Sequence, residues 1–148
     1  MQDKKNKRKQ NILLLLVIGT ALGLAVYFQF FLSESADEVK TEITELVAKY
    51  NKNCPLTIQK GIRLDSVSLP KQSEERAVQY NLTLMNVDKG TAEIDVIRTE
   101  IQKSLLSTAK ANPGLQVFRD NDYTLIYSYH DKKKMFLFDV KILPDQYK

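Results

Sequence analysis

The sequence predicts an α+β protein, in which an N-terminal transmembrane helix precedes a two-layer domain of element order α-β-β-α-β-β. Residues 12–32 are uncharged and apolar, two later segments have helical apolar spacing, and four segments alternate like strands. Two helical stripes and four half-apolar strands need one shared core. A four-stranded antiparallel sheet with both helices on one face supplies such a core.

The segment 12–32 is long enough to cross a bilayer. Its 21 residues carry no charge, and as a helix they extend roughly 31 Å, the thickness of the hydrocarbon core. The arm 1–11 contains five basic residues against Asp3, which predicts a cytoplasmic N-terminus. The predicted organisation is therefore a cytoplasmic arm (1–11), a signal-anchor (12–32) and an extracytoplasmic domain (33–148) in a single-pass protein of the cell membrane.

Two further interpretations concern this N-terminal region. A cleaved signal peptide would have a similar basic arm, and Ser33-Glu34-Ser35 offers a small-x-small cleavage pattern. The apolar run is longer than the 7–15 residues of a usual signal peptide, so an uncleaved anchor is favoured. Gly19 and Gly23 have the GxxxG spacing that lets membrane helices approach closely, which suggests a weak homodimer.

The charge of the predicted domain argues against nucleic-acid binding. Residues 33–148 contain 17 basic and 17 acidic side chains (22 − 5 and 18 − 1), so they lack the positive surface that displaces counterions from phosphates. Lys132, Lys133 and Lys134 form the one basic run of this domain. Because they fall in a predicted turn, a solvated tip is the simpler interpretation.

The first three elements are predicted from local patterns. Ser35 and Glu38 form a capping box, and an apolar stripe follows over 39–50 until Asn51. Residues 56–58 are a short extended piece, residues 62–69 are a strand candidate, and residues 78–84 alternate cleanly. The last two segments are expected to pair as an antiparallel hairpin.

The second half repeats this order. Thr91 is a candidate N-cap, and apolar residues recur along 94–105 until Asn112-Pro113-Gly114 ends the helix. Residues 123–130 and 135–143 are two strands joined by a turn at 131–134. The residues expected to meet in the core are Leu46, Leu82, Ile97 and Phe138.

No motif for catalysis or for a cofactor is visible. Cys54 is the one cysteine and His130 the one histidine, so only one Cys–His nucleophile pair is possible. A zinc site, which needs three or four such ligands, is improbable. A buried thiol and a surface histidine are the simpler interpretations. Asp120 and Asp122 lack the glycine and distal glutamate of a calcium loop. The sequence thus predicts no catalytic, cofactor or metal-binding residue, and a protein that is not an enzyme.

Three tyrosines on one strand are the candidate contact residues. Tyr123, Tyr127 and Tyr129 share one face of a predicted strand. At this spacing aromatic residues are usually core, but two helices need not cover the whole face, and the uncovered part could contact a ligand or partner.

Five short segments carry a family resemblance. They are Asn53-Cys54-Pro55, residues 63–67 (RLDSV), residues 80–84 (YNLTL), Asn112-Pro113 and residues 119–121 (RDN). This pattern resembles small, uncharacterised bacterial proteins with an N-terminal hydrophobic segment. The resemblance implies a bacterial, extracytoplasmic protein and brings no activity or ligand with it.

These observations favour a membrane-anchored extracytoplasmic domain that binds another protein at the membrane surface. The alternative is a module that binds cell-wall glycan or a peptide through the sheet tyrosines. A hydrolase with dispersed carboxylates is the third hypothesis, because acidic residues are plentiful and carry no signature.

Overall fold

The computed structural model describes residues 37–71 and 76–148. The chain divides into two units, Met1–Thr41 and Glu42–Lys148, and the second contains the sheet. The predicted membrane segment 12–32, the Gly19 and Gly23 pair and the Ser35 cap lie outside the described residues. No helix within 37–71 or 76–148 has the length and apolar character needed to cross a membrane.

The first helix covers residues 37–52. In its part from residue 42 onward, Ile43 and Val47, four positions apart, are buried with 0% and 8% of their surface exposed. The side chain of Asn51 then holds the helix end against the sheet. Its Nδ2 donates to the Val67 carbonyl over 2.7 Å, and the Val67 N–H donates to its Oδ1 over 2.8 Å.

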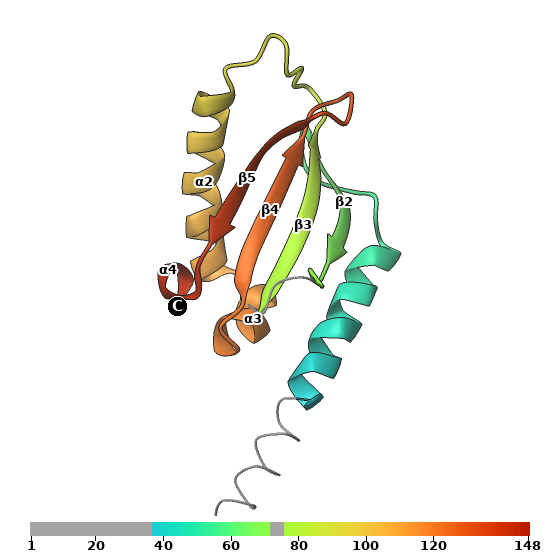
Figure 1. The fold of residues 1–148 in the computed structure, drawn as a ribbon, viewed down its shortest axis with the longest axis vertical. Coiled ribbons are helices and arrows are strands. Elements are labelled where there is room, and N and C mark those ends of the chain that lie inside the picture. The colour runs from blue at the N-terminus through green and yellow to red at the C-terminus, as the bar shows by residue number, and fades with distance from the viewer. Residues whose placement is uncertain (1–36, 72–75) are drawn as a thin grey trace, which may run out of the picture. The chain divides into compact units, whose positions relative to one another are not determined.

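The sheet has five strands in sequence order (Figure 1). They are β1 (Leu56–Gln59), β2 (Ile62–Ser68), β3 (Ala77–Leu84), β4 (Thr124–His130) and β5 (Phe136–Ile142). The predicted four-stranded antiparallel sheet is therefore wrong in two respects. The short segment that begins at Leu56 is a fifth strand at the edge, and β3 pairs with β4 in parallel, whereas the other pairs are antiparallel.

The parallel pair follows from the helix between its strands. Helix α2 (Ile94–Ala111) has 18 residues, which extend about 27 Å, close to the length of an eight-residue strand. The helix returns the chain to the end of the sheet where β3 began, so β4 must run in the same direction as β3. A crossover of this kind is how parallel neighbours are joined.

A bulge explains why β2 alternates poorly in sequence. Leu64 pairs with Leu82 and Ser66 pairs with Asn81, so Asp65 is an additional residue. The additional residue resets the alternation, and both Leu64 and Val67 then face the core, with 8% and 2% exposed.

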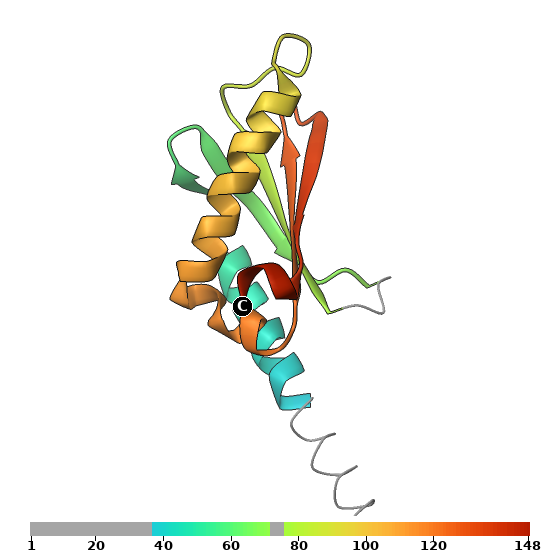
Figure 2. The same cartoon turned by 90° about the vertical axis from the view of Figure 1, so that its left-hand side faces the viewer.

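Three short helices complete the helical layer, and none of them was predicted. They are η1 (Pro113–Leu115), α3 (Gln116–Asp120) and α4 (Pro144–Tyr147). Phe118 of α3 and Tyr147 of α4 are fully buried, and the Tyr147 hydroxyl donates to the Tyr123 carbonyl. Figure 2 shows α2, α3 and α4 on the same side of the sheet as the helical residues 42–52.

The core lies between this helical layer and one face of the sheet. Of the four predicted core residues, Leu82 and Phe138 are buried with 2% and 4% exposed. Leu46 and Ile97 are only half-buried. The strands thus supply the predicted core, whereas both helices leave part of their apolar stripe exposed.

Candidate functional site

Cys54 and His130 contact different neighbours. The Cys54 thiol donates to the Tyr50 carbonyl over 3.3 Å, and a cis peptide bond joins Cys54 to Pro55. Burial, with a smaller effect of the Asp65 carboxylate, raises the pKa of the thiol and disfavours the thiolate. His130 ends β4 and meets the Phe136 ring edge-on at 5.9 Å. Among the described residues, the contacts of Cys54 and His130 therefore include no activating partner.

The carboxylates do not assemble into a metal site in the described ranges 37–71 and 76–148. Asp120 accepts a hydrogen bond from Gln116 over 2.7 Å. Asp122 pairs with Lys148 and has a positive φ of 57°, as expected for a turn residue. Both residues therefore have ordinary surface roles.

The three candidate tyrosines belong to the core or lie next to it. Tyr127 and Tyr129 have 8% and 2% of their surface exposed. Tyr127 stacks on Tyr80 with ring centroids 5.0 Å apart, and Tyr129 packs on Phe138 at 5.2 Å. Burial raises the pKa of Tyr129 to about 12. Tyr123 is half-buried against Phe118. Side chains this enclosed offer little surface to a glycan or peptide.

On the opposite face of the sheet several polar side chains bond to one another, whereas Asp139 Oδ1 is buried without a hydrogen-bond partner among the described residues. Gln79 donates to Asn81, and Asn81 donates to Ser66, each over 2.9 Å. Asp65 accepts from Arg63 over 2.6 Å and from Thr83 over 2.5 Å. These pairs stabilise this face, over which the described part of the chain places no helix.

Helix α2 has an apolar surface that the domain covers only in part. Ala109 is its one buried residue. We define the α2 stripe as the five large apolar residues that are half-buried instead: Ile94, Ile97, Ile101, Leu105 and Leu106. The cause is the position of the helix, because among the strands it packs chiefly against β5 at the sheet edge. An edge position leaves one flank of the stripe uncovered.

Strand β1 exposes apolar side chains at the other edge of the sheet. All four of its residues are exposed, including Leu56 at 46% and Ile58 at 52%. Leu56 pairs with Leu64 and points to the helical side of the sheet. The helical side therefore has incompletely covered apolar groups at both edges, on α2 and on β1.

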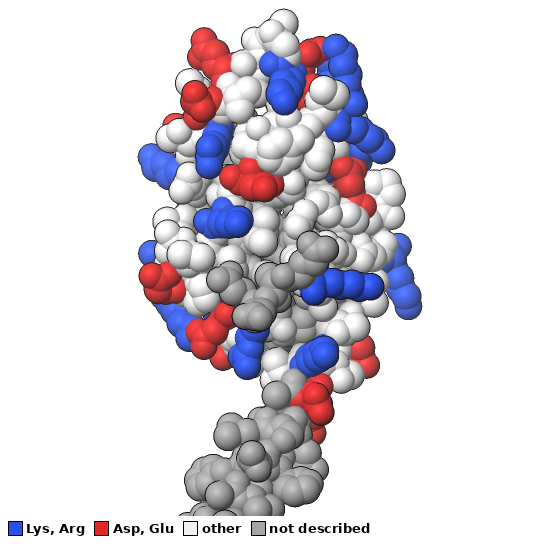
Figure 3. All heavy atoms as spheres, viewed as in Figure 1, with Lys and Arg blue, Asp and Glu red and all other residues white. Residues whose placement is uncertain are grey.

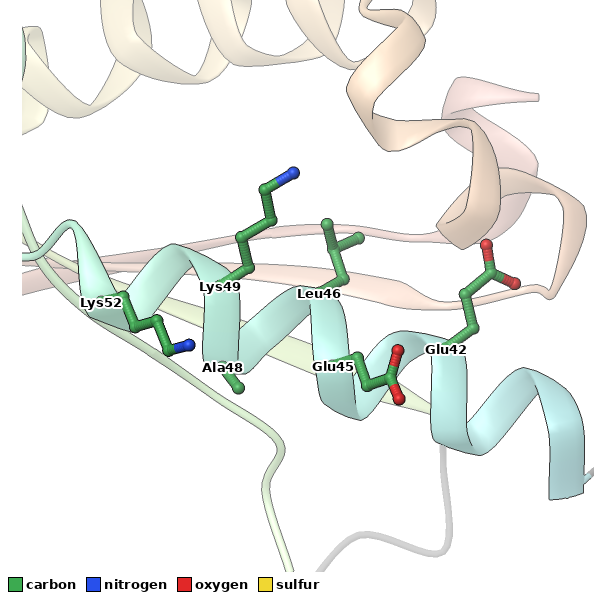
Figure 4. A pocket seen from close by; sticks show the side chains of 6 residues that line it. All are labelled: Glu42, Glu45, Leu46, Ala48, Lys49 and Lys52. Atoms are coloured by element: carbon green, nitrogen blue, oxygen red, sulfur yellow. The ribbon is translucent and has the colours of Figure 1, made fainter.

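The outer face of the first helix is polar in comparison. A shallow hollow of about 540 Å³ lies along it, lined by Glu42, Glu45, Leu46, Ala48, Lys49 and Lys52 (Figure 4). Lys49 and Lys52 lie in the last turn, where basic residues suit the helix macrodipole. This face is an ordinary solvated helix surface.

One end of the sheet is held together by a buried carboxylate. Asp131, with 1% exposed, accepts hydrogen bonds from the backbone N–H groups of Lys89, Lys133 and Met135 over 2.8–3.0 Å. Burial alone would raise its pKa, but the three amides outweigh burial and lower the pKa below its usual range. Asp131 thus fixes the β4–β5 turn against the loop after β3.

Comparison with known proteins identifies the family and the fold. The model of a domain of unknown function, DUF8479, matches residues 36–138. The chain belongs to this family. No curated protein matches the chain in sequence.

Two solved structures of the same fold come from bacteria. A candidate secreted protein of Pseudomonas aeruginosa is 12% identical, with a TM-score of 0.59 over 75% of this chain and 94% of that one. The pilotin EpsS of the Vibrio vulnificus type 2 secretion system is 9% identical, with a TM-score of 0.60 over 78% and 97%. At these identities the likeness concerns the fold.

Two features of the structure, the exposed flank of the α2 stripe and the bonding of Asp131, are not predicted by the sequence. The α2 stripe has the spacing of a core helix, and periodicity cannot show that the helix lies at a sheet edge. Asp131 does have a local signal, since an aspartate that opens a turn often accepts from the amides that follow it. The hydrogen bond that the Lys89 N–H donates to Asp131 joins residues far apart in the sequence, so no local pattern indicates it.

Proposed function

We propose that this chain is a non-enzymatic protein of the bacterial cell envelope whose extracytoplasmic domain binds a protein partner through the α2 stripe. The partial exposure of the stripe is the observation that carries the proposal. Uncovered apolar area of this kind is typical of protein-binding surfaces. An amphipathic or extended apolar segment of a partner would complete its burial.

The location rests on the N-terminal sequence and on the kinds of protein that share the fold. We propose that residues 12–32 hold the chain in the cytoplasmic membrane, with residues 1–11 inside the cell. A candidate secreted protein and a pilotin of type 2 secretion have the same fold, which supports an envelope location and a partner protein for this chain.

Photo-crosslinking in intact cells tests the surface. A photoreactive phenylalanine analogue placed at Ile101, on the α2 stripe, should give a discrete adduct that mass spectrometry can identify. The matched control is Lys103, an exposed residue of the same helix outside the stripe. Adducts of equal yield from both positions, or from neither, would contradict the assignment of the stripe.

A further inference from the structure

A second surface lies at the end of the sheet that carries the β4–β5 turn. We define the basic tip as five lysines from three loops: Lys60, Lys89, Lys132, Lys133 and Lys134. The loops are hydrogen-bonded to one another, because Met85 N–H donates to the Gly61 carbonyl over 2.8 Å and Lys132 N–H donates to the Val87 carbonyl over 3.0 Å. Figure 3 shows the basic side chains gathered at the upper right of this face.

The basic tip departs from the charge balance of the domain. Its loops contain three carboxylates, Asp88, Glu93 and Asp131, so five lysines against three acidic residues leave a net charge of +2. Asp131 is buried, and Asp88 pairs with Lys133 over 2.8 Å and with Lys132 over 3.6 Å. Lys132 and Lys133 nevertheless have 48% and 65% of their side chains exposed. Glu93 is the last residue of its loop, next to α2, and Asp95 lies in the first turn of that helix.

Large apolar side chains flank these lysines. Met85, Met135 and Phe136 are exposed at 43%, 54% and 48%. Lys89 Nζ donates to the Phe136 carbonyl over 2.9 Å, so the ammonium group lies beside the backbone of an exposed aromatic residue. Solvated turns seldom need exposed phenylalanine and methionine, whereas membrane-surface sites combine apolar side chains that enter the interface with lysines at headgroup level.

We propose that the basic tip docks on an anionic lipid surface, with Phe136 and Met135 entering the interface and the lysines contacting phosphate headgroups. Nucleic acid fits less well, because the charge is confined to one end of the domain and lacks the stripe that tracks a phosphate backbone. An acidic protein segment would satisfy the lysines but would not need the exposed methionines. This proposal is independent of the α2 stripe.

Vesicle sedimentation tests the proposal with the full chain held in phosphatidylcholine nanodiscs, so that any membrane segment is already occupied. Vesicles that contain phosphatidylglycerol should bring down the nanodiscs, and vesicles of pure phosphatidylcholine should not. Lys134→Glu should lower the bound fraction severalfold, because each lysine near an anionic surface contributes appreciably. Phe136→Ser should weaken binding at low and high salt alike, whereas the Lys134→Glu effect should shrink as salt screens the charge.

Lys103→Glu is the matched control, because it makes the same charge change at an exposed residue of α2 away from the basic tip. It should bind like the wild type, and circular dichroism should show all three variants folded. Equal sedimentation with both kinds of vesicle would overturn the proposal, as would equal losses for Lys103→Glu and Lys134→Glu. Tip-dependent capture by soluble polyglutamate without vesicle binding would assign the basic tip to an acidic protein instead.

Discussion

Single side chains join the elements of this domain where backbone pairing ends. Strand β1 pairs with β2 only as far as Leu64, which leaves the edge of β2 open at Val67. Asn51 fills this position with a donor and an acceptor from one amide. The Asn51 amide thus supplies the two hydrogen bonds that a neighbouring strand would make to Val67, and it also fixes the end of the first helix.

Asn51→Ala should therefore destabilise the domain by about 1–3 kcal/mol, because it leaves buried backbone groups of Val67 without partners. Denaturant unfolding of the full chain would measure the loss. Asn53→Ala is the control, since the Asn53 side chain makes one exposed bond of 3.3 Å to the Lys49 carbonyl. An equal loss in both variants would show that Asn51 does not have this role.

Asp131 predicts a pH dependence of stability. The pKa of Asp131 is lower in the folded state than in the unfolded state. Its contribution to the free energy of unfolding is therefore fully present above the unfolded pKa, near 3.9, and is lost as the pH falls through the folded pKa. Asp131→Asn should be less stable than the wild type at neutral pH, because an amide NH₂ cannot accept from the surrounding N–H groups. Unfolding at several pH values should show this difference narrowing below about pH 4. A difference that stays constant with pH would exclude the carboxylate as its source.

The unique thiol and imidazole are expected to be dispensable for function. Cys54→Ser and His130→Ala should both complement a deletion phenotype, because burial disfavours the thiolate and His130 contacts an aromatic ring rather than a nucleophile. Blotting should confirm normal protein levels. Normal accumulation of either variant without complementation would support an enzyme.

At the scale of elements, the helices and strands contribute unequally to the core. Strands β3 and β4 have neighbours on both sides, and their inward residues are nearly all buried. Helix α2 lies against the edge strand β5, and the five residues of its stripe are only half-buried. A helix that adds little burial for its length is suited to presenting a surface.

Alanine substitutions should reveal this inequality. Leu82→Ala, in the centre of β3, should lower the free energy of unfolding by about 2–5 kcal/mol. Ile97→Ala, on the α2 stripe, should lower it by about 1 kcal/mol, because the Ile97 side chain is only half-buried and its truncation removes little buried apolar area. Denaturant unfolding of the two variants side by side gives the comparison. A larger loss for Ile97→Ala would mean that the stripe is part of the core and would remove the basis of the proposed partner surface.

At the scale of the whole molecule, a neutral domain follows a strongly basic arm and an uncharged segment. This order predicts that residues 12–32 remain in the mature protein with residues 1–11 in the cytoplasm, because the apolar run exceeds the length of a cleavable segment. Intact-protein mass and protease accessibility on spheroplasts would measure both features. A soluble mature form that begins at Ala36 would contradict the prediction.

Local patterns in the sequence determined most elements of this protein. Alternation predicted β3, β4 and β5, Asn112-Pro113 predicted the end of α2, and the unique Cys54 and His130 argued against a nucleophilic site. The short helices were not predicted, because each has too few residues to show the repeated apolar spacing of a helix.

Only the tertiary structure decided the sheet and the surfaces. Periodicity shows which face of an element is apolar, but it does not show the direction in which strands pair or how much of a face its neighbours cover. The parallel pairing of β3 with β4 depends on where α2 returns the chain. The exposure of the α2 stripe depends on the edge position of that helix. The basic tip depends on three loops that are distant in sequence: two of them meet at Asp131, and the third bonds to Met85 through Gly61. Each of these arises from contacts between distant residues, and no local sequence pattern records them.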